Sequence, residues 1–170
     1  HLSGQMVSFH LSTGALWLLF FGMITSFFAC YLGTTAKSLK SQRFWLLGLA
    51  LSLFGALGVF SLQDAASFFI AWEVMSFGGA VMILGERLDK GIDRSVFLML
   101  CLLEVGAVAI LLGLIAFSYA AGGISFSQFA SSAHNLPNAL QFFIGLLFFI
   151  GFGAKLGILP FYEWVPGAYG

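Results

Sequence analysis

Long apolar stretches alternate with short polar ones along the whole chain. A bilayer core about 30 Å thick is spanned by roughly 20 apolar residues in a helix, and five stretches are of about that length. They cover residues 11–32, 44–61, 65–85, 95–118 and 141–161. We expect helices because backbone groups in lipid must be hydrogen-bonded within their own element. The pattern predicts an all-α membrane protein with about five transmembrane helices in a single domain, residues 1–170.

The polar connections between these stretches differ in length. Only residues 62–64 separate the second stretch from the third, which predicts a tight helical hairpin. The longer connection, residues 119–140, mixes serines with aliphatic and aromatic residues. This mixture predicts a short amphipathic helix that begins near Ser125 or Ser127 and lies along the outer surface of the membrane.

Composition and charge agree with a chain in lipid. Hydrophobic residues make up 60% of the chain and charged residues 8%, whereas a soluble domain carries about 25% charged residues. Seven basic and seven acidic residues cancel, so the net charge does not favour binding to nucleic acid. Cys30 and Cys101 lie in separate apolar stretches without a CxxC motif or a nearby histidine. We therefore expect no metal site and no cofactor on this chain.

Most of the basic residues lie in two connections, residues 33–43 and 86–94. They are Lys37, Lys40, Arg43, Arg87, Lys90 and Arg94. Cytoplasmic loops of membrane proteins carry an excess of lysine and arginine. We therefore expect both connections in the cytoplasm and the N-terminus on the outer side.

Three ionisable residues, Glu73, Glu104 and Lys155, lie deep within apolar stretches. A charged side chain at such depth costs about 2.5–3.5 kcal/mol and usually faces the interior of the helix bundle or a hydrated cavity, where it marks a path for ions or protons. A desolvated carboxyl group holds a proton when it is alone and releases it when a cation approaches. The three residues are candidates for proton transfer. The alternative is a buried Glu–Lys pair that only joins helices.

Glycines and a proline surround the intramembrane lysine. Gly153 and Gly157 flank Lys155, and Pro160 cannot donate a hydrogen bond to the Leu156 carbonyl. These residues predict a break in the last helix between Lys155 and Pro160. Broken membrane helices occur where backbone is buried in protein or lines a water-filled cavity. The alternative is that Gly153 and Gly157 form a helix-packing face and Pro160 ends the span.

Two motifs carry a resemblance to a known family. Residues 68–76, FFIAWEVMS, look like its glutamate-bearing helix, and residues 151–169, GFGAKLGILPFYEWVPGAY, look like its broken helix with lysine and proline. The family comprises the antiporter-like membrane subunits of complex I, Mrp cation antiporters and membrane-bound hydrogenases. Both motifs look most like the large membrane component of hydrogenase 4 and formate hydrogenlyase. Glu163 departs from the family pattern, since many relatives have histidine or another residue at this position before the tryptophan.

The resemblance implies the N-terminal half of a proton-translocating subunit in a bacterial or archaeal cell membrane. In the family a glutamate and a lysine form a charge pair that is made and broken during proton transfer. These roles carry over to Glu73 and Lys155 but not to Glu104. The implied partners are other membrane-arm subunits and the peripheral redox subunits that hold the redox centres of an NADH-quinone oxidoreductase or a hydrogenase.

Three alternatives remain open from the sequence. The chain could be a structural module of the membrane arm without its own ion path, or part of an Mrp-type Na⁺/H⁺ antiporter. A subunit that binds haem or quinone is the third alternative. Haem is poorly supported because no apolar stretch contains an interior histidine pair. Packing against lipid and between helices accounts for the 21 phenylalanines more simply than a quinone site does.

Overall fold

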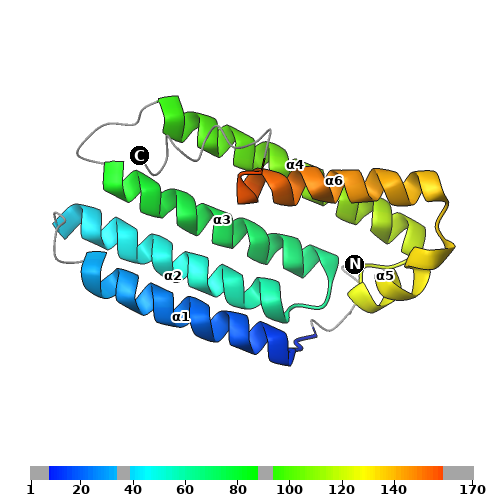
Figure 1. Ribbon diagram of the computed structural model, residues 1–170, viewed down its shortest axis with the longest axis horizontal. Coiled ribbons are helices and arrows are strands. Elements are labelled where there is room, and N and C mark those ends of the chain that lie inside the picture. Colours follow the sequence, from blue (N-terminus) through cyan, green and yellow to red (C-terminus); the bar gives the residue numbers. More distant parts are fainter. Residues whose placement is uncertain (1–7, 34–38, 88–93, 159–170) are drawn as a thin grey trace, which may run out of the picture.

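The computed structural model describes residues 8–33, 39–87 and 94–158, and within these ranges the long elements are all helices (Figure 1). Five of them are long and apolar enough to cross a membrane. These are α1 (Thr13–Gly33), α2 (Leu39–Ser61), α3 (Ala65–Arg87), α4 (Arg94–Ala121) and α6 (Asn138–Leu156). The predicted all-α fold with five spanning helices is confirmed.

The largest differences from the expected helix ends, of five residues each, occur at the start of α2 and the end of α6. Helix α2 begins at Leu39 rather than near residue 44. A membrane helix can extend through polar first turns into the headgroup region, and a search for apolar residues does not include those turns. Helix α6 ends at Leu156 rather than near residue 161. Gly157 has a φ of 65°, in the left-handed region that favours glycine, and its N–H donates to the Gly153 carbonyl.

The helices α1, α2 and α3 lie side by side and antiparallel, and α4 and α6 pack together beyond α3 (Figure 1). The end of α1, the start of α2, the end of α3 and the start of α4 meet at one end of the bundle. The two basic connections therefore leave from the same end. Residues 34–38 and 88–93 of these connections lie outside the described ranges.

Close approach of backbones joins α2 to α3. A Cβ atom on Gly78 of α3 would lie 2.6 Å from the Gly48 carbonyl oxygen of α2, and one on Gly55 would lie 2.6 Å from the Met75 Cα. Glycines let membrane helices approach this closely because they present no side chain at the interface. The Ser52 hydroxyl, on α2, also donates to the Met75 carbonyl at 2.9 Å. The second and third spans therefore form the predicted hairpin, and its two helices are in close contact along their length.

The connection from α4 to α6 contains a short helix at the other end of the bundle. It consists of α5 (Phe126–Ser132) and a 3₁₀ turn, η1 (Ala133–Asn135). Ser125 occupies the N-cap position, and its N–H donates to Gln128 Oε1 at 3.1 Å. Phe129 is buried and stacks on Phe117 with 4.3 Å between ring centroids. The short helix is therefore anchored on α4, while its place at the outer membrane surface stays a prediction.

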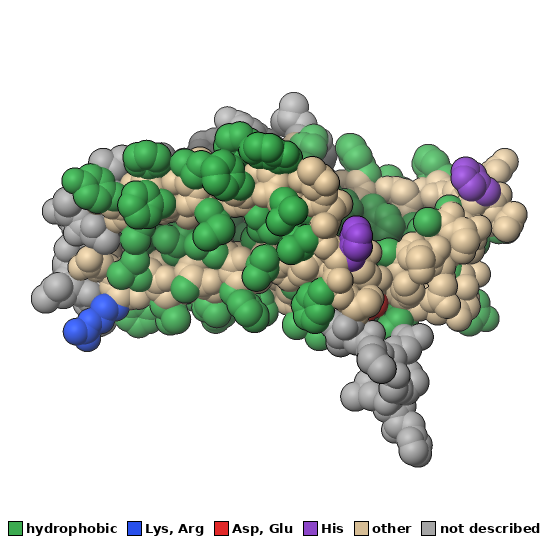
Figure 2. Space-filling model, turned by 90° about the horizontal axis from the view of Figure 1, so that it is seen from below, with side chains coloured by type: hydrophobic (Ala, Val, Ile, Leu, Met, Phe, Trp, Pro, Cys, Tyr) green, Lys and Arg blue, Asp and Glu red, His purple; other side chains and the backbone are tan. Residues whose placement is uncertain are grey.

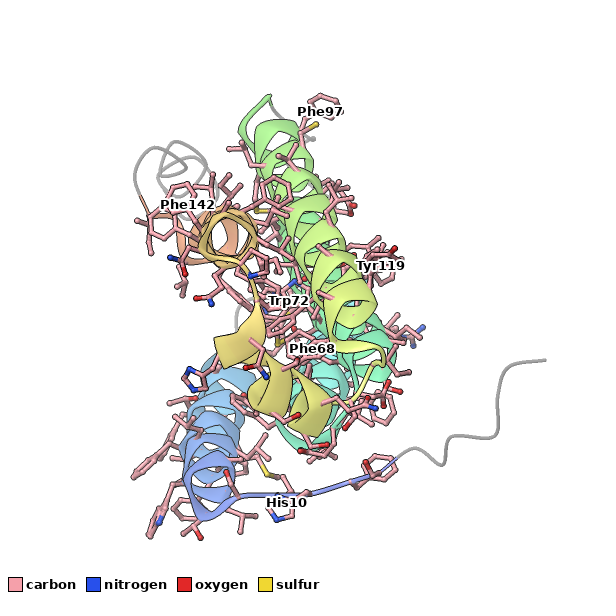
Figure 3. The ribbon with its side chains drawn as sticks, turned by 90° about the vertical axis from the view of Figure 1, so that its right-hand side faces the viewer. His10, Phe68, Trp72, Phe97, Tyr119 and Phe142 are labelled. Atoms are coloured by element: carbon pink, nitrogen blue, oxygen red, sulfur yellow. The ribbon has the colours of Figure 1, made fainter. Side chains whose placement is uncertain are left out.

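The surface of the bundle is apolar over much of its length. In Figure 2 hydrophobic side chains cover a broad area over the long helices, the basic side chain in view lies at one end, and one of the two histidines lies near the other end. In Figure 3, Trp72 lies between helices, whereas Phe97, Tyr119 and Phe142 project outward. Such an exterior suits contact with lipid or with other apolar helices.

Candidate functional site

The intramembrane lysine lies at the end of α6 and contacts the middle of α3. Lys155 Nζ donates a hydrogen bond to Ser76 Oγ and lies 4.3 Å from the centroid of the Trp72 ring. Ser76 is next to the midpoint of the α3 span, Ala65–Gly85. Because the lysine meets α3 at this level, the last residues of α6 lie beside the middle of α3.

The two partners of the lysine share one face of α3, since residues four apart in a helix lie one above the other. The Ser76 hydroxyl donates to the Trp72 carbonyl at 2.9 Å, which leaves a lone pair on its oxygen for the ammonium group. The Trp72 ring also meets Phe152 of α6 edge-on, with 5.2 Å between centroids. The face of α3 that receives α6 is therefore built to hold a cation by one hydrogen bond and one cation–π contact.

A close approach of α4 and α6 sets the position of the lysine on α6. A Cβ atom on Gly151 would lie 2.8 Å from the Gly106 carbonyl oxygen of α4, and one on Gly106 would lie 2.8 Å from the Ala154 Cβ. Gly151 and Ala154 are both buried. Gly151 precedes Lys155 by four residues, which is about one helical turn. Its contact with α4 therefore fixes the position along α3 that the lysine reaches.

Glu73 follows Trp72 on α3 but points to different surroundings. Its Oε1 is buried and has no hydrogen-bond partner. The charges of Glu104 and Lys155 both act on this carboxyl group. Among the described residues, Glu73 and Lys155 form no direct ion pair, because the lysine is held by Ser76 and Trp72. The charge pair that the family resemblance implies stays a prediction.

A cavity of about 380 Å³ between α3 and α4 brings the two glutamates together. Glu73 and Ser76 line it from α3, and Glu104 lines it from α4. The side chain of Glu104 is exposed at the outer edge of the bundle. The remaining lining residues are apolar: Leu51, Val74, Phe77, Ala80, Leu100 and Leu103. Ser76 thus connects the lysine on one side with the acidic cavity on the other.

The residues expected at the helix break are described in part. Gly153 is buried within α6, and Gly157 terminates the helix with its left-handed backbone. A close glycine contact with α4 is made by Gly151. The alternative packing face formed by Gly153 and Gly157 stays a prediction. Pro160 and Glu163 lie outside the described residues.

Sequence reasoning did not single out Trp72 and Ser76 as contacts of the lysine. Both lie within the motif FFIAWEVMS, four residues apart and on either side of Glu73. The signal available in the sequence was a serine hydroxyl one helical turn after a tryptophan, with a glutamate of an apolar stretch between them. The rotation of α3 about its axis, which decides whether these residues or Glu73 face α6, is set by packing.

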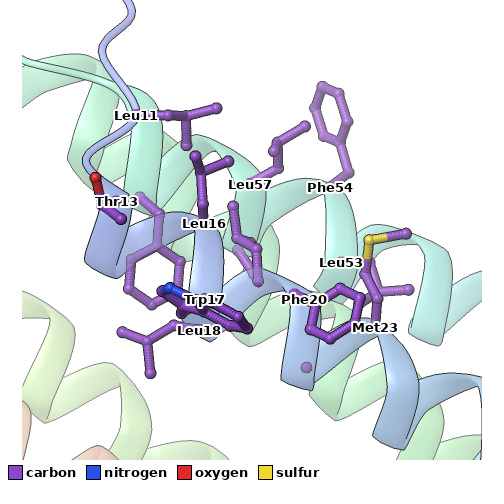
Figure 4. A pocket seen from close by; sticks show the side chains of 14 residues that line it. Leu11, Thr13, Leu16, Trp17, Leu18, Phe20, Met23, Leu53, Phe54 and Leu57 are labelled. Atoms are coloured by element: carbon purple, nitrogen blue, oxygen red, sulfur yellow. The ribbon is translucent and has the colours of Figure 1, made fainter.

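A larger cavity lies elsewhere. A groove of about 880 Å³ runs between α1 and α2, and Figure 4 shows leucine, phenylalanine, methionine and tryptophan side chains around it. Its only polar lining side chain besides the indole N–H of Trp17 is the hydroxyl of Thr13. A wall of this kind offers no group that exchanges protons, so the small acidic cavity is the better candidate for ion chemistry.

Comparison with known proteins identifies the family of this chain. The family described as NADH:quinone oxidoreductase/Mrp antiporter, transmembrane, matches residues 62–170, which include all three intramembrane charges. The chain belongs to this family. The resemblance in the sequence is therefore confirmed at the level of the family.

Several individual relatives extend the comparison. NAD(P)H-quinone oxidoreductase chain 4 1 of Picosynechococcus sp. is 32% identical over 123 residues, which are 72% of this chain and 23% of that protein. Hydrogenase-4 component B of Escherichia coli is 27% identical over 108 residues, which are 64% of this chain and 16% of that protein.

A solved structure is similar over nearly the whole chain. It is the membrane-bound sulfane sulfur reductase, an archaeal respiratory membrane complex, with a TM-score of 0.83 and 29% identity. The match covers 99% of this chain and 27% of the other. The chain thus spans about a quarter or less of the length of these relatives.

Proposed function

We propose that this chain is the proton-transferring part of an antiporter-like membrane subunit in a complex I-like NADH-quinone oxidoreductase or a membrane-bound hydrogenase. Protons move between Lys155 and the two glutamates of the cavity, and partner chains carry the electrons. The observation that carries the proposal is the lysine at the end of a helix that stops beside the middle of α3, in contact with Ser76 of the acidic cavity.

The geometry supports an exchange of partners by the lysine. In the described arrangement the ammonium group is held by Ser76 and Trp72, while Glu73 has an oxygen without a partner. Lysine has a long, flexible side chain, and α6 ends one residue after it. A shift of the ammonium group toward Glu73 would make the ion pair, and a return to Ser76 would break it. Making and breaking this pair changes which group holds the proton most strongly.

The orientation of the chain is part of the same proposal. The flanks of both basic connections lie at one end of the bundle (Figure 1). By the preference of lysine and arginine for cytoplasmic loops, this end faces the cytoplasm, and the N-terminus and α5 face the outer side. Other membrane-arm subunits and peripheral redox subunits are the proposed partners.

The test is replacement of Lys155 by alanine in the full-length subunit within its complex, reconstituted in liposomes. We expect proton uptake coupled to electron transfer to fall to background, since no titrating cation remains at the end of α6. Assembly of the complex is expected to persist, because Gly151 and Ala154 rather than the lysine make the contact with α4. The measurement is quenching of a pH-sensitive dye per assembled complex.

Phe149→Ala serves as the matched control, since this side chain is on the same helix and exposed. Normal proton uptake by an assembled Lys155→Ala complex would overturn the proposal. Loss of assembly in both Lys155→Met and Glu73→Gln, without a selective loss of transport, would instead assign the charges a structural role. Replacing H⁺ by Na⁺ gradients in the same liposomes distinguishes a sodium path.

A further inference from the structure

We propose that the outer face of α4 docks a helix of a neighbouring membrane subunit, which presents a lysine or arginine to Glu104. We define this outer stripe of α4 by six residues that the structure leaves exposed: Phe97, Cys101, Glu104, Val108, Ile115 and Tyr119. The proposal concerns assembly and does not depend on proton transfer by the site.

The outer stripe follows one side of α4 from end to end. Its members recur at intervals of three, four or seven residues, which is the spacing of one helix face. Phe97 and Tyr119, near the two ends, both project away from the bundle (Figure 3). The opposite side of α4 carries Gly106, Ile110 and Gly113, which pack on α6. The outer stripe thus stays exposed along α4 in the described part of the chain, although Glu104, Ile115 and Tyr119 border open spaces between α4 and α3.

A glutamate on this face does not suit contact with lipid. Glu104 lines the same cavity as Glu73, a residue within two positions of the midpoint of the α3 span. Ionisable side chains within spanning segments nearly always face other protein or a hydrated cavity. Glu104 is the one charged member of a stripe that is otherwise apolar apart from a phenol and a thiol. A protein surface is therefore expected to cover it.

Charge balance indicates the chemistry of that surface. The described intramembrane charges are Glu73 and Glu104 against Lys155 alone, so one carboxylate is in excess. Lys155 is already held by Ser76 and Trp72, on the side of α3 that faces α6. A cation for Glu104 must therefore come from outside the described bundle. Charged pairs across an interface also fix the register of the two partners.

A neighbouring subunit is the occupant to which we commit. The similar solved structure is a respiratory membrane complex. Two further similar proteins are named as parts of enzymes: chain 4 1 of an NAD(P)H-quinone oxidoreductase and component B of hydrogenase-4. On a long apolar stripe, one central charge favours a partner helix that carries the opposite charge at the same position along its length. Lipid, another helix of the same polypeptide and a second copy of this chain are the competing occupants.

The first experiment places a photoreactive benzophenone side chain at Val108 in the full-length subunit within its complex. Val108 is one turn from Glu104 and 54% exposed. After illumination in native membranes we expect an adduct with another membrane subunit, and mass spectrometry locates a lysine or arginine near the adduct. Adducts only with lipid, with the same polypeptide or with a second copy of the chain would each overturn the proposal.

The second experiment reverses the charge. Glu104→Lys is expected to lower co-purification of the neighbouring subunit by about tenfold or more, because it opposes two like charges. Glu104→Gln, which inserts into the membrane without a new charge, is expected to lower co-purification by a smaller factor. Leu146→Lys is the control, since it places a lysine on an exposed position of α6. Unchanged co-purification in both Glu104 variants would contradict the docked cation.

Discussion

The two sides of α3 differ in how they meet their neighbours. On one side α3 approaches α2 so closely that a methyl group would not fit at Gly78 or at Gly55. Two described hydrogen bonds also join these helices, from the Ser52 hydroxyl to the Met75 carbonyl and from the Ser41 hydroxyl to the Gly85 carbonyl. On the other side the helix diverges from α4 and leaves a cavity lined by Glu73 and Glu104. The first side holds the helix in place, and the second side leaves room for ionisable groups.

This difference follows from the absence of a hydrophobic driving force between helices in lipid. Association there depends on close packing and interhelical hydrogen bonds, so a helix that must also line a cavity needs one face packed tightly. Helix α3 has that face toward α2. Its remaining surface can then carry Trp72, Glu73 and Ser76 without loss of position. The closely packed face toward α2 thus holds α3 in position, and the rest of its surface carries the ionisable group and the contacts of the lysine.

The largest effect is expected from breaking the tight side. In Gly78→Leu the new side chain meets the Gly48 carbonyl and the Ser52 backbone, which cannot move aside. We expect a loss of about 3 kcal/mol or more in the free energy of unfolding, and little folded subunit. Gly79→Leu is the matched control, because a Cβ atom there meets nothing within 4 Å. Denaturation in mixed micelles measures both, and equal losses would contradict the proposed packing.

The next effect compares two serines on the two sides. Ser76→Ala removes the acceptor of the Lys155 ammonium group, a hydrogen bond to a charged group that contributes about 1.5–3 kcal/mol. We expect proton transport per assembled complex to fall about tenfold. Ser52→Ala removes the hydrogen bond on the tight side and is expected to cost about 0.6 kcal/mol of stability without a change in transport. An equal loss of transport in both variants would contradict the difference between the two sides of α3.

The smallest effect is expected from the ring beneath the lysine. Trp72→Phe keeps an aromatic side chain that packs on Phe152 but weakens the cation–π contact by about 0.5–1 kcal/mol. A decrease of about two- to fivefold in transport, with normal assembly, is the expected result. Trp17→Phe on α1, which lines the apolar groove, is expected to leave transport unchanged. A decrease of the same size in both variants would show a general packing effect.

Much of the fold could be read from hydropathy, and less of the site. The five spans were predictable because each must carry enough apolar residues to cross the bilayer. The end of α6 was misplaced by several residues, since Leu156 and Ile158 are apolar on both sides of Gly157, whose left-handed backbone stops the helix. Hydropathy gives the depth of a residue, but it carries little information on backbone conformation.

The site shows the same limit from another direction. Glu73, Glu104 and Lys155 were identifiable because a charge within an apolar stretch is costly wherever the helix turns. Their contacts were not predictable. Which of Trp72, Glu73 and Ser76 faces the lysine depends on the rotation of α3, and the exposure of Glu104 depends on the tilt of α4.

The sequence by itself determined that this chain has five stretches long and apolar enough to cross a membrane and carries three charges within them, because transfer into lipid depends on composition and length. The tertiary structure decided that Lys155 rests on Ser76 and Trp72, and that Glu73 and Glu104 share one cavity. These contacts depend on the rotation and spacing of helices, and those are set where glycines allow backbones to meet.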